Sequence, residues 1–286
     1  MNQAKPLDRS ALASHPLPPV IDGGKESKGR ILVIAGSREV PGAALLCATA
    51  ALRAGAGKLR IATVDTVAPR AGLAMPEAMV AGMPEDGDGG FSLHSVSVLA
   101  EQARRVDAVV AGPGMSRGKA GAKIAEALLA SDASLAFDAA LLHELQPLKA
   151  ERSRPPILLP HSRELASLLD CGEQQILREP IRCGLRAAEL YRSVVLVKGV
   201  VSHVVTPGGE VWTYEGGAPG LGVSGSGDVL AGIVGGLLAR GAEPLNALLW
   251  SVWLHGEAGA RLADRIGPIG FLAREIAGEV PPLLRG

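Results

Sequence analysis

The 286-residue sequence lacks the features that are typical of proteins that bind nucleic acids or membrane surfaces. Only 3% of its residues are aromatic, and 29 basic residues are balanced by 29 acidic ones. The first count leaves few side chains that could stack on bases, and the second leaves no net charge to attract an anionic polymer or lipid. We therefore expect neither nucleic acid nor a membrane as a partner.

Cysteines and long apolar runs are also scarce. Cys47, Cys171 and Cys183 are odd in number and far apart, which fits neither a disulfide framework nor a zinc site. The longest strongly apolar run, Val229–Ala239, is too short and too rich in glycine to cross a bilayer. Met1–Ser14 has no apolar core of the kind a signal peptide needs. These absences predict a cytoplasmic protein.

What the sequence does contain is a regular alternation of short β-branched runs with Ala- and Leu-rich stretches. Residues 1–28 are rich in proline, lysine and glycine and predict an irregular arm, which leaves residues 29–286 as one domain. Strands that are apolar throughout and separated by helices indicate an α/β fold whose central sheet is mostly parallel and covered on both faces. The expected strands are Ile31–Ala35, Leu59–Val64, Ala108–Ala111, Leu135–Asp138, Ile157–Leu159 and Val194–Val197, followed by a hairpin of Ser202–Thr206 and Glu210–Tyr214. The expected helices are Ala43–Ala54, Ala120–Ala130, Glu164–Asp170, Ile176–Tyr191, Asp228–Arg240, Leu245–Asp264 and Gly270–Ala277.

A glycine-rich loop in Gly216–Gly241 is the most informative segment, because it carries one acidic residue and runs directly into an apolar helix. Gly225, Ser226 and Gly227 can present bare backbone N–H groups, and the positive end of the helix dipole adds to their field. The carboxylate of Asp228 would repel a phosphate bound there, so we expect it at this position only if the chemistry needs it. A hydroxyl that loses its proton as a phosphoryl group arrives supplies that need. The loop therefore predicts phosphoryl transfer, although a tight helix–sheet contact with Asp228 as a simple helix cap also fits its residues.

Two other phosphate-binding motifs do not fit the sequence. Gly220–Gly225 formally matches G-x-G-x-x-G, but it lies near the C-terminus and leads into consecutive helices rather than opening a first βαβ unit. No G-x-x-x-x-G-K-[ST] occurs anywhere, which excludes a Walker P-loop.

Polar or glycine-rich segments also follow five of the expected strands. In open α/β sheets ligands gather where strands end, so these segments predict a common cleft with the glycine loop. Taken singly, each one is equally explained as a tight turn, a helix cap or a solvated strand end. The segments are Gly36-Ser37, Gly112–Gly114, Asp138, His161 and Lys198-Gly199.

In order along the chain, these motifs resemble those of the ADP-dependent NAD(P)H-hydrate dehydratases, a branch of the ribokinase-like kinases. The similarity runs from about Gly29 to Leu284. It includes PGAALLCATAALRAGAGKLRIAT (Pro41–Thr63), PEAMV (Pro76–Val80), AGPGM (Ala111–Met115), LPHSREL (Leu159–Leu165), VLVKG (Val195–Gly199), GSGDVLAGIVGGLLARG (Gly225–Gly241) and LHGEAG (Leu254–Gly259).

The resemblance implies a single-domain ribokinase-like three-layer sandwich and a repair reaction on a nicotinamide cofactor that has added water. ADP or ATP, with Mg²⁺, phosphorylates the hydroxyl of NADH or NADPH hydrate, and phosphate then leaves to restore the reduced cofactor. Asp228 is implied as the catalytic base. Ala43, Gly114 and His161 are implied to bind the hydrate together with Asp228. The implied nucleotide-binding residues are Lys198, Gly199, Val200, Val201, Ser202, Gly225, Ser226 and Gly227; no metal ligand is implied.

The sequence departs from the family pattern mainly on the substrate side. Val40 stands where an aromatic is usual, Ala140 replaces a carboxylate, and Ala218 replaces an asparagine, whereas the phosphate loop and Asp228 are intact. Substrate identity is therefore less fixed by the sequence than reaction class, and the choices between NADH and NADPH hydrate and between ADP and ATP stay open. A ribokinase-like kinase of a small alcohol, such as a sugar or vitamin precursor, is the alternative, and a non-catalytic nucleotide-binding protein is a third. Exposed apolar helix faces favour a homo-oligomer, for which a tetramer is one arrangement.

Overall fold

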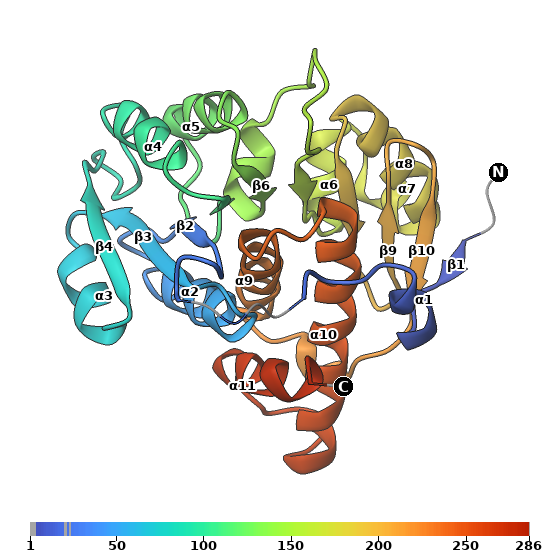
Figure 1. Cartoon of the computed structure of the whole chain (residues 1–286). Coiled ribbons are helices and arrows are strands. Elements are labelled where there is room, and N and C mark those ends of the chain that lie inside the picture. Colours follow the sequence, from blue (N-terminus) through green and yellow to red (C-terminus); the bar gives the residue numbers. More distant parts are fainter. Residues whose placement is uncertain (1–3, 20–21, 23, 286) are drawn as a thin grey trace.

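A computed structural model describes residues 4–19, 22 and 24–285. Within them, one 10-stranded sheet has the order β1-β10-β9-β8-β7-β6-β5-β2-β3-β4, and its strands from β8 to β4 run parallel to one another. Figure 1 shows the sheet with helices on both sides. The predicted α/β fold with a mostly parallel sheet is confirmed, and the described residues form one domain.

The elements alternate along the chain much as the sequence predicts. The strands are β1 (Lys5–Pro6), β2 (Arg30–Ile34), β3 (Lys58–Val64), β4 (Ala78–Met83), β5 (Ala108–Ala111), β6 (Ser134–Phe137), β7 (Ile157–Leu158), β8 (Val194–Val197), β9 (Ser202–Val205) and β10 (Val211–Tyr214). The α-helices are α1 (Arg9–Ala13), α2 (Gly42–Arg53), α3 (Ala68–Ala74), α4 (Ser95–Ala103), α5 (Lys119–Leu129), α6 (Ser162–Leu168), α7 (Glu173–Arg178), α8 (Pro180–Leu190), α9 (Ser226–Ala239), α10 (Pro244–Arg265) and α11 (Ala273–Leu283). Short 3₁₀ helices occupy η1 (Ala139–Glu144) and η2 (Pro219–Leu221).

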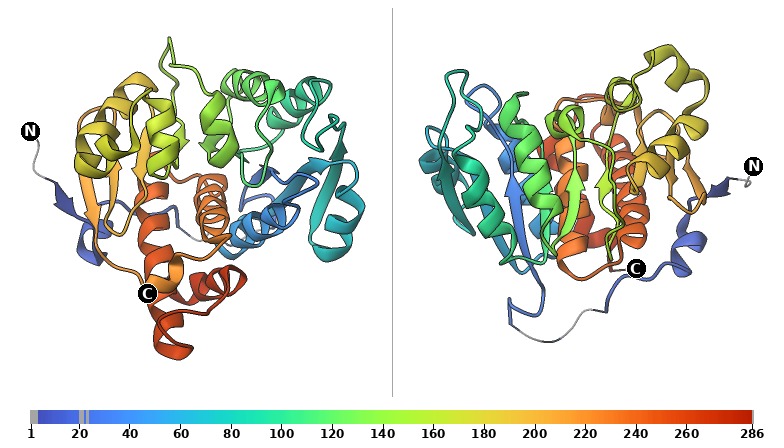
Figure 2. Two further views of the ribbon diagram at one scale, coloured as in Figure 1. Left: turned by 180° about the vertical axis from the view of Figure 1, so that it is seen from behind. Right: turned by 90° about the horizontal axis from the view of Figure 1, so that it is seen from above.

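Each central strand buries both of its faces. In β2, Ile31 and Val33 face one hydrophobic cluster, and Leu32 and Ile34 face another on the opposite side of the sheet. The first cluster contains residues of α2, α9, α10 and α11, and the second contains residues of α4 to α8. In Figure 1 the helices of these two layers lie above and below the strands, and the view from above in Figure 2 looks down onto the layer that contains the green helices α4 and α5. Continuous burial explains why the strands are apolar at every position rather than at alternate ones.

Helix α9 lies closer to its neighbours than ordinary side chains would allow. A Cβ added at Gly232 would clash with the carbonyl oxygen of Cys47, and one at Gly236 would clash with that of Ala51, both on α2. On the sheet side, a Cβ at Gly235 would overlap the Val110 side chain of β5. The glycines of this helix therefore allow it to pack tightly against α2 and the sheet. A tight helix–sheet contact was the alternative explanation of the glycine-rich segment.

Between β3 and β8, three elements and one helix break were not predicted. α3, β4 and α4 belong to a stretch to which the sequence pattern assigned no element. The single helix predicted at Ile176–Tyr191 is wrong, because α7 ends at Arg178 and α8 begins at Pro180. Proline cannot donate the backbone hydrogen bond that a continuous helix needs, and it disfavours helical geometry at Glu179 before it.

The irregular arm predicted at residues 1–28 is also corrected. Lys5 and Pro6 form β1, which pairs in parallel with β10, and Asp8 caps α1. Leu12 is buried against the first cluster, and the Trp250 indole on α10 donates a 2.8 Å hydrogen bond to the carbonyl of His15. Elements this short are stabilised by such tertiary contacts rather than by any periodicity of their own. Residues 1–3, 20, 21 and 23 of that arm, and Gly286 of the predicted domain, lie outside the described residues.

Across the described part of the chain, no helix combines the length and the apolar character needed to cross a membrane.

We expect Gly232→Ala to destabilise the fold by about 1–3 kcal/mol, because the added methyl must push α9 away from the backbone of α2. Gly278→Ala on α11 is the matched control, since a Cβ there meets nothing within 4 Å. In a helix interior that change should stabilise by about 0.5–1 kcal/mol. Urea unfolding of both variants measures the difference; equal free energies of unfolding would contradict this account of the packing.

Candidate active site

The polar strand-end segments lie along one edge of the sheet. β8, β7, β6, β5 and β2 are consecutive neighbours and all parallel. Their carboxyl ends therefore point the same way, and the segments that follow them form one row. The segments therefore share one edge of the sheet, and the common cleft that they were expected to form stays a prediction.

The glycine loop reaches the same edge through the first turn of α9. Gly225 has a φ of +89°, in the left-handed region, and a Cβ there would lie 2.5 Å from Leu46 Cδ1 of α2. Ser226, Gly227 and Asp228 then form the first turn, in which the Ser226 N–H donates to the Val223 carbonyl and the N–H groups of Gly227 and Asp228 have no intrahelical acceptors. This turn has the geometry of an anion site, with the positive end of the helix dipole behind it.

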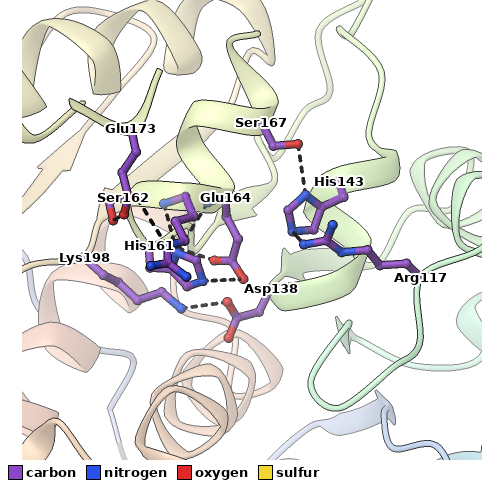
Figure 3. Close-up of polar contacts among 10 residues, drawn as sticks. Arg117, Asp138, His143, His161, Ser162, Glu164, Ser167, Glu173 and Lys198 are labelled. Carbon is purple, nitrogen blue, oxygen red and sulfur yellow. Dashed lines mark hydrogen bonds and ion pairs between the residues drawn. The ribbon is translucent and has the colours of Figure 1, made fainter. Parts of the chain in front are cut away.

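A buried ion pair lies beside this turn. Lys198 Nζ is 2.7 Å from Asp138 Oδ1, and the two side chains are 21% and 4% exposed. Figure 3 shows the two groups pointing toward each other, from the ends of β8 and β6. A Cβ added at Gly227 would lie 3.7 Å from Lys198 Nζ and 4.0 Å from Asp138 Oδ2. The first turn of α9 therefore lies close to both charges, at distances that a Cβ would also accept.

Asp228 has the electrostatics of a general base. Burial, and secondly the charge of Asp138, raise its pKa to about 6, while Lys198 opposes the shift. Burial likewise raises the pKa of Asp138, against the lowering effect of Lys198. A carboxylate with a pKa near 6 is ionised at neutral pH and is a stronger proton acceptor than an ordinary aspartate.

A cavity of about 800 Å³ opens on one flank of this charged centre, between β8, β9, the η2 loop and α10. Six of the eight predicted nucleotide-binding residues line it: Lys198, Gly199, Val200, Ser202, Ser226 and Gly227. Val201 and Gly225 are not part of its lining, and Gly225 instead packs on Leu46 and Ala273. Ala218, one of the departures from the family pattern, also lines the cavity.

The predicted hydrate-binding residues fall in two places. Ala43 and Gly114 are neighbours on the β2–β5 flank, since a Cβ at Gly114 would lie 2.5 Å from Ala43 Cβ and 2.8 Å from the Val40 carbonyl oxygen. His161 instead lines the cavity on the opposite flank. Its ring Nδ1 accepts the N–H groups of Arg163 and Glu164, so it caps α6 while its side chain stays 51% exposed.

Several polar residues of the site were missed by the sequence prediction. Asp138 was placed in the predicted cleft but was given no role. His255 lies within the LHGEAG motif but was given no role; it contacts Ser226 and lines the cavity. Farther out, Figure 3 shows Arg117 bonded to His143, and His143 to Ser167, a chain of contacts that no motif indicated.

The residues present fit a magnesium ion that is carried by nucleotide phosphates. No group of three or more His, Cys, Asp or Glu residues within the described ranges is arranged to hold a metal by itself. Asp138 and Asp228 are close enough for one charge to shift the other's pKa. Mg²⁺ is usually bound by one or two protein carboxylates together with phosphate oxygens of the substrate. The carboxylates of Asp138 and Asp228 are therefore the candidate protein ligands.

Comparison with known proteins places this site in a family. A sequence model described as NAD(P)H-hydrate dehydratase matches residues 31–282. The chain belongs to the NAD(P)H-hydrate dehydratase family. An ADP-dependent (S)-NAD(P)H-hydrate dehydratase of Xanthomonas campestris pv. campestris is 44% identical over 283 residues, which cover 99% of this chain and 96% of that protein.

Other members of the dehydratase family extend the comparison. A bifunctional NAD(P)H-hydrate repair enzyme of Moorella thermoacetica is 33% identical over 268 residues, covering 92% of this chain but 50% of that enzyme. The chain therefore spans half the length of that relative. A solved structure of ADP/ATP-dependent NAD(P)H-hydrate dehydratase from Bacillus subtilis, co-crystallised with ATP and Mg²⁺, matches with a TM-score of 0.86 at 25% identity and covers 100% of this chain and 99% of that one. The ribokinase-like architecture predicted from the sequence is confirmed.

Replacing Asp138 should change the acidity of Asp228. We expect Asp138→Asn to move the Asp228 titration below its wild-type midpoint of about 6, because a charge that raises the pKa is gone and Lys198 is released toward Asp228. Carboxyl ¹³C NMR of aspartate-labelled protein measures both midpoints. Asp132→Asn, which removes an exposed carboxylate, is the control and should leave the midpoint in place. An unmoved midpoint in Asp138→Asn would show that the two carboxylates are not coupled.

Proposed function

We propose that this protein removes water from hydrated NADH or NADPH, using ADP or ATP to phosphorylate the hydroxyl and then releasing phosphate. The observation that carries the proposal is Asp228, whose pKa is raised to about 6 in the first turn of a helix whose N–H groups suit a phosphate. Membership of the dehydratase family supports the substrate and the outcome, making the enzyme a lyase rather than a simple kinase.

The two flanks of the charged centre suit two substrates. The cavity over β8, β9 and α10 would hold the nucleotide, with its phosphates directed at Ser226 and Gly227. The flank at Ala43 and Gly114 would hold the hydrated nicotinamide ring, so that its hydroxyl meets the phosphoryl group beside Asp228. His161, on the nucleotide flank, would reach a ring only where the two ligands meet.

In the first step Asp228 accepts the hydroxyl proton while the hydroxyl oxygen bonds to the terminal phosphorus and the phosphorus–oxygen bond to the rest of the nucleotide breaks. First-turn N–H groups of α9 and the Lys198 ammonium balance the phosphoryl charge. Mg²⁺, when bound with the phosphates near Asp138 and Asp228, supplies further charge neutralisation. The ring then loses phosphate from one carbon and a proton from its neighbour, which restores the double bond that hydration had removed.

The decisive experiment mixes purified protein, Mg²⁺ and ADP or ATP with chemically hydrated NADH and NADPH, and follows absorbance of the reduced nicotinamide. Recovery with release of phosphate is the expected result. A stable phosphorylated hydrate, detected by mass spectrometry, would support a kinase that stops after the first step. Nucleotide binding with no turnover on any alcohol would support a non-catalytic protein.

Asp228→Asn should lower turnover by about 10²–10⁴-fold, the usual contribution of a general base. Binding of nucleotide should survive or tighten, because the charge that repels phosphate is removed. In the wild type, turnover should fall as the pH drops through about 6, because a protonated Asp228 cannot accept the hydroxyl proton. Stopped assays and calorimetry measure the two quantities, with Asp132→Asn as control. Turnover that persists in Asp228→Asn would remove this residue from the base role.

Self-association is also proposed, as a homo-oligomer such as a tetramer. Its support is the apolar surface at the β4 end of the sheet, where Leu73 is 87% exposed and Met79 60% exposed. Leu73→Glu should shift the mass measured by light scattering toward that of one chain. A wild-type mass equal to one chain would contradict the proposal.

A cytoplasmic location is proposed for the same protein. Cys47, Cys171 and Cys183 are all free, which suits a reducing compartment. The soluble substrates of the proposed reaction are consistent with that location.

A further inference from the structure

His255 lies on α10, opposite the first turn of α9, and is a half-buried wall residue of the cavity. Its ring Nε2 is 3.0 Å from the hydroxyl oxygen of Ser226 and 3.1 Å from the carbonyl oxygen of the same residue. Ser226 is the first residue of α9, and Asp228 follows it in the same turn. The histidine therefore contacts the anion site from behind, through one serine.

These two contacts determine which ring nitrogen carries the proton. A carbonyl oxygen can only accept a hydrogen bond, so the contact with the Ser226 carbonyl requires a proton on Nε2. Burial lowers the pKa of His255 to about 4, with Lys198 adding to this and the Ser226 backbone opposing it. The ring is therefore neutral at physiological pH, with Nε2–H as its one donor, shared between the Ser226 carbonyl and hydroxyl oxygens.

The consequence falls on the Ser226 hydroxyl. Its oxygen accepts from His255, so its own proton is not used in that contact. Among the described residues, the Ser226 hydroxyl forms its hydrogen bond with His255. Ser226 also lines the cavity. The serine proton is thus available to an acceptor placed at the first turn of α9, where the helix dipole favours an anion.

We propose that His255 is a positioning residue that fixes the Ser226 hydroxyl as a hydrogen-bond donor to the terminal phosphate of the bound nucleotide. The inference rests on the proposed nucleotide-dependent phosphoryl transfer and deepens it. The terminal phosphate is the relevant one because Asp228, in the same turn as Ser226, receives the proton displaced by that phosphate's transfer. In this arrangement His255 acts on the terminal phosphate through Ser226.

The test compares the affinities for ADP and AMP, because AMP lacks the phosphate that Ser226 is proposed to bind. We expect His255→Phe and Ser226→Ala each to weaken ADP binding about tenfold or more, the size of effect of one hydrogen bond to a charged group. Binding of AMP should change by less than about twofold. In the double variant, His255→Phe should add almost nothing to Ser226→Ala, since the histidine acts through the serine. Calorimetry measures all four proteins with each nucleotide.

Two further variants test whether His255 positions the Ser226 hydroxyl or only fills space. His255→Gln retains an N–H that can reach the serine and should recover most of the affinity for ADP. His203→Phe is the control: His203 is buried and its Nδ1 is 2.9 Å from a hydroxyl, that of Thr213, but it does not line the cavity. Its replacement should leave the ratio of ADP to AMP affinity unchanged.

Several outcomes would overturn the inference. Equal loss of ADP and AMP affinity in His255→Phe, or the same loss whether or not Ser226 is present, would reduce His255 to a packing residue. If His255→Phe does not fold, Ser226→Ala carries the test alone, and an unchanged ratio of affinities there is contrary to the inference. Wild-type protein that restores NADH while the variants keep the wild-type ratio would overturn this inference and leave the proposed function standing. Wild-type protein that binds neither ADP nor ATP would remove both.

Discussion

The arrangement of the site depends on how closely the backbone of α9 approaches the backbone of α2. Gly232 and Gly236 face carbonyl oxygens of α2, and Gly235 faces the Val110 side chain of β5, so the helix is held closely on two sides. Such contacts leave almost no freedom to slide, because packed interiors tolerate little change of volume. The N-terminus of α9 is thereby fixed at the carboxyl edge of the sheet, where a helix dipole can act on an anion.

Every charge of the site is arranged around that fixed helix end. β6 and β8 are separated by β7 alone, so their ends bring Asp138 and Lys198 together beside Gly227. Asp228 takes its raised pKa from the same proximity and from burial. An aspartate near a helix N-terminus would ordinarily have a lowered pKa, so here desolvation outweighs the dipole. The base and the anion site are therefore products of one packing arrangement.

Much of this could be predicted from the sequence, for identifiable reasons. Strands buried on both faces appear in the sequence as continuous apolar runs, so most strands of the sheet could be predicted. A glycine loop before an apolar helix is also a local signal, and it drew attention to Asp228. β1 and α1 were not, because two and five residues show no periodicity and are held by α10 and β10. The role of Asp138 depends on strand order, and that of His255 on the packing of α10 against α9. Neither property is local in sequence, and the position of His161 at the cavity, away from Ala43 and Gly114, has the same origin.

The position of the Lys198–Asp138 pair between the two flanks has one more consequence. Water reaching the pair screens its field at Asp228, and each bound ligand would displace part of that water. Binding on either flank would lower the local dielectric for all three charges, whereas a phosphate would add negative charge and a cation would remove it. The proton affinity of the base is then not a constant of the folded chain. The proton affinity of Asp228 would vary with which ligands are bound, so that binding of one ligand would change how readily Asp228 accepts a proton from the other.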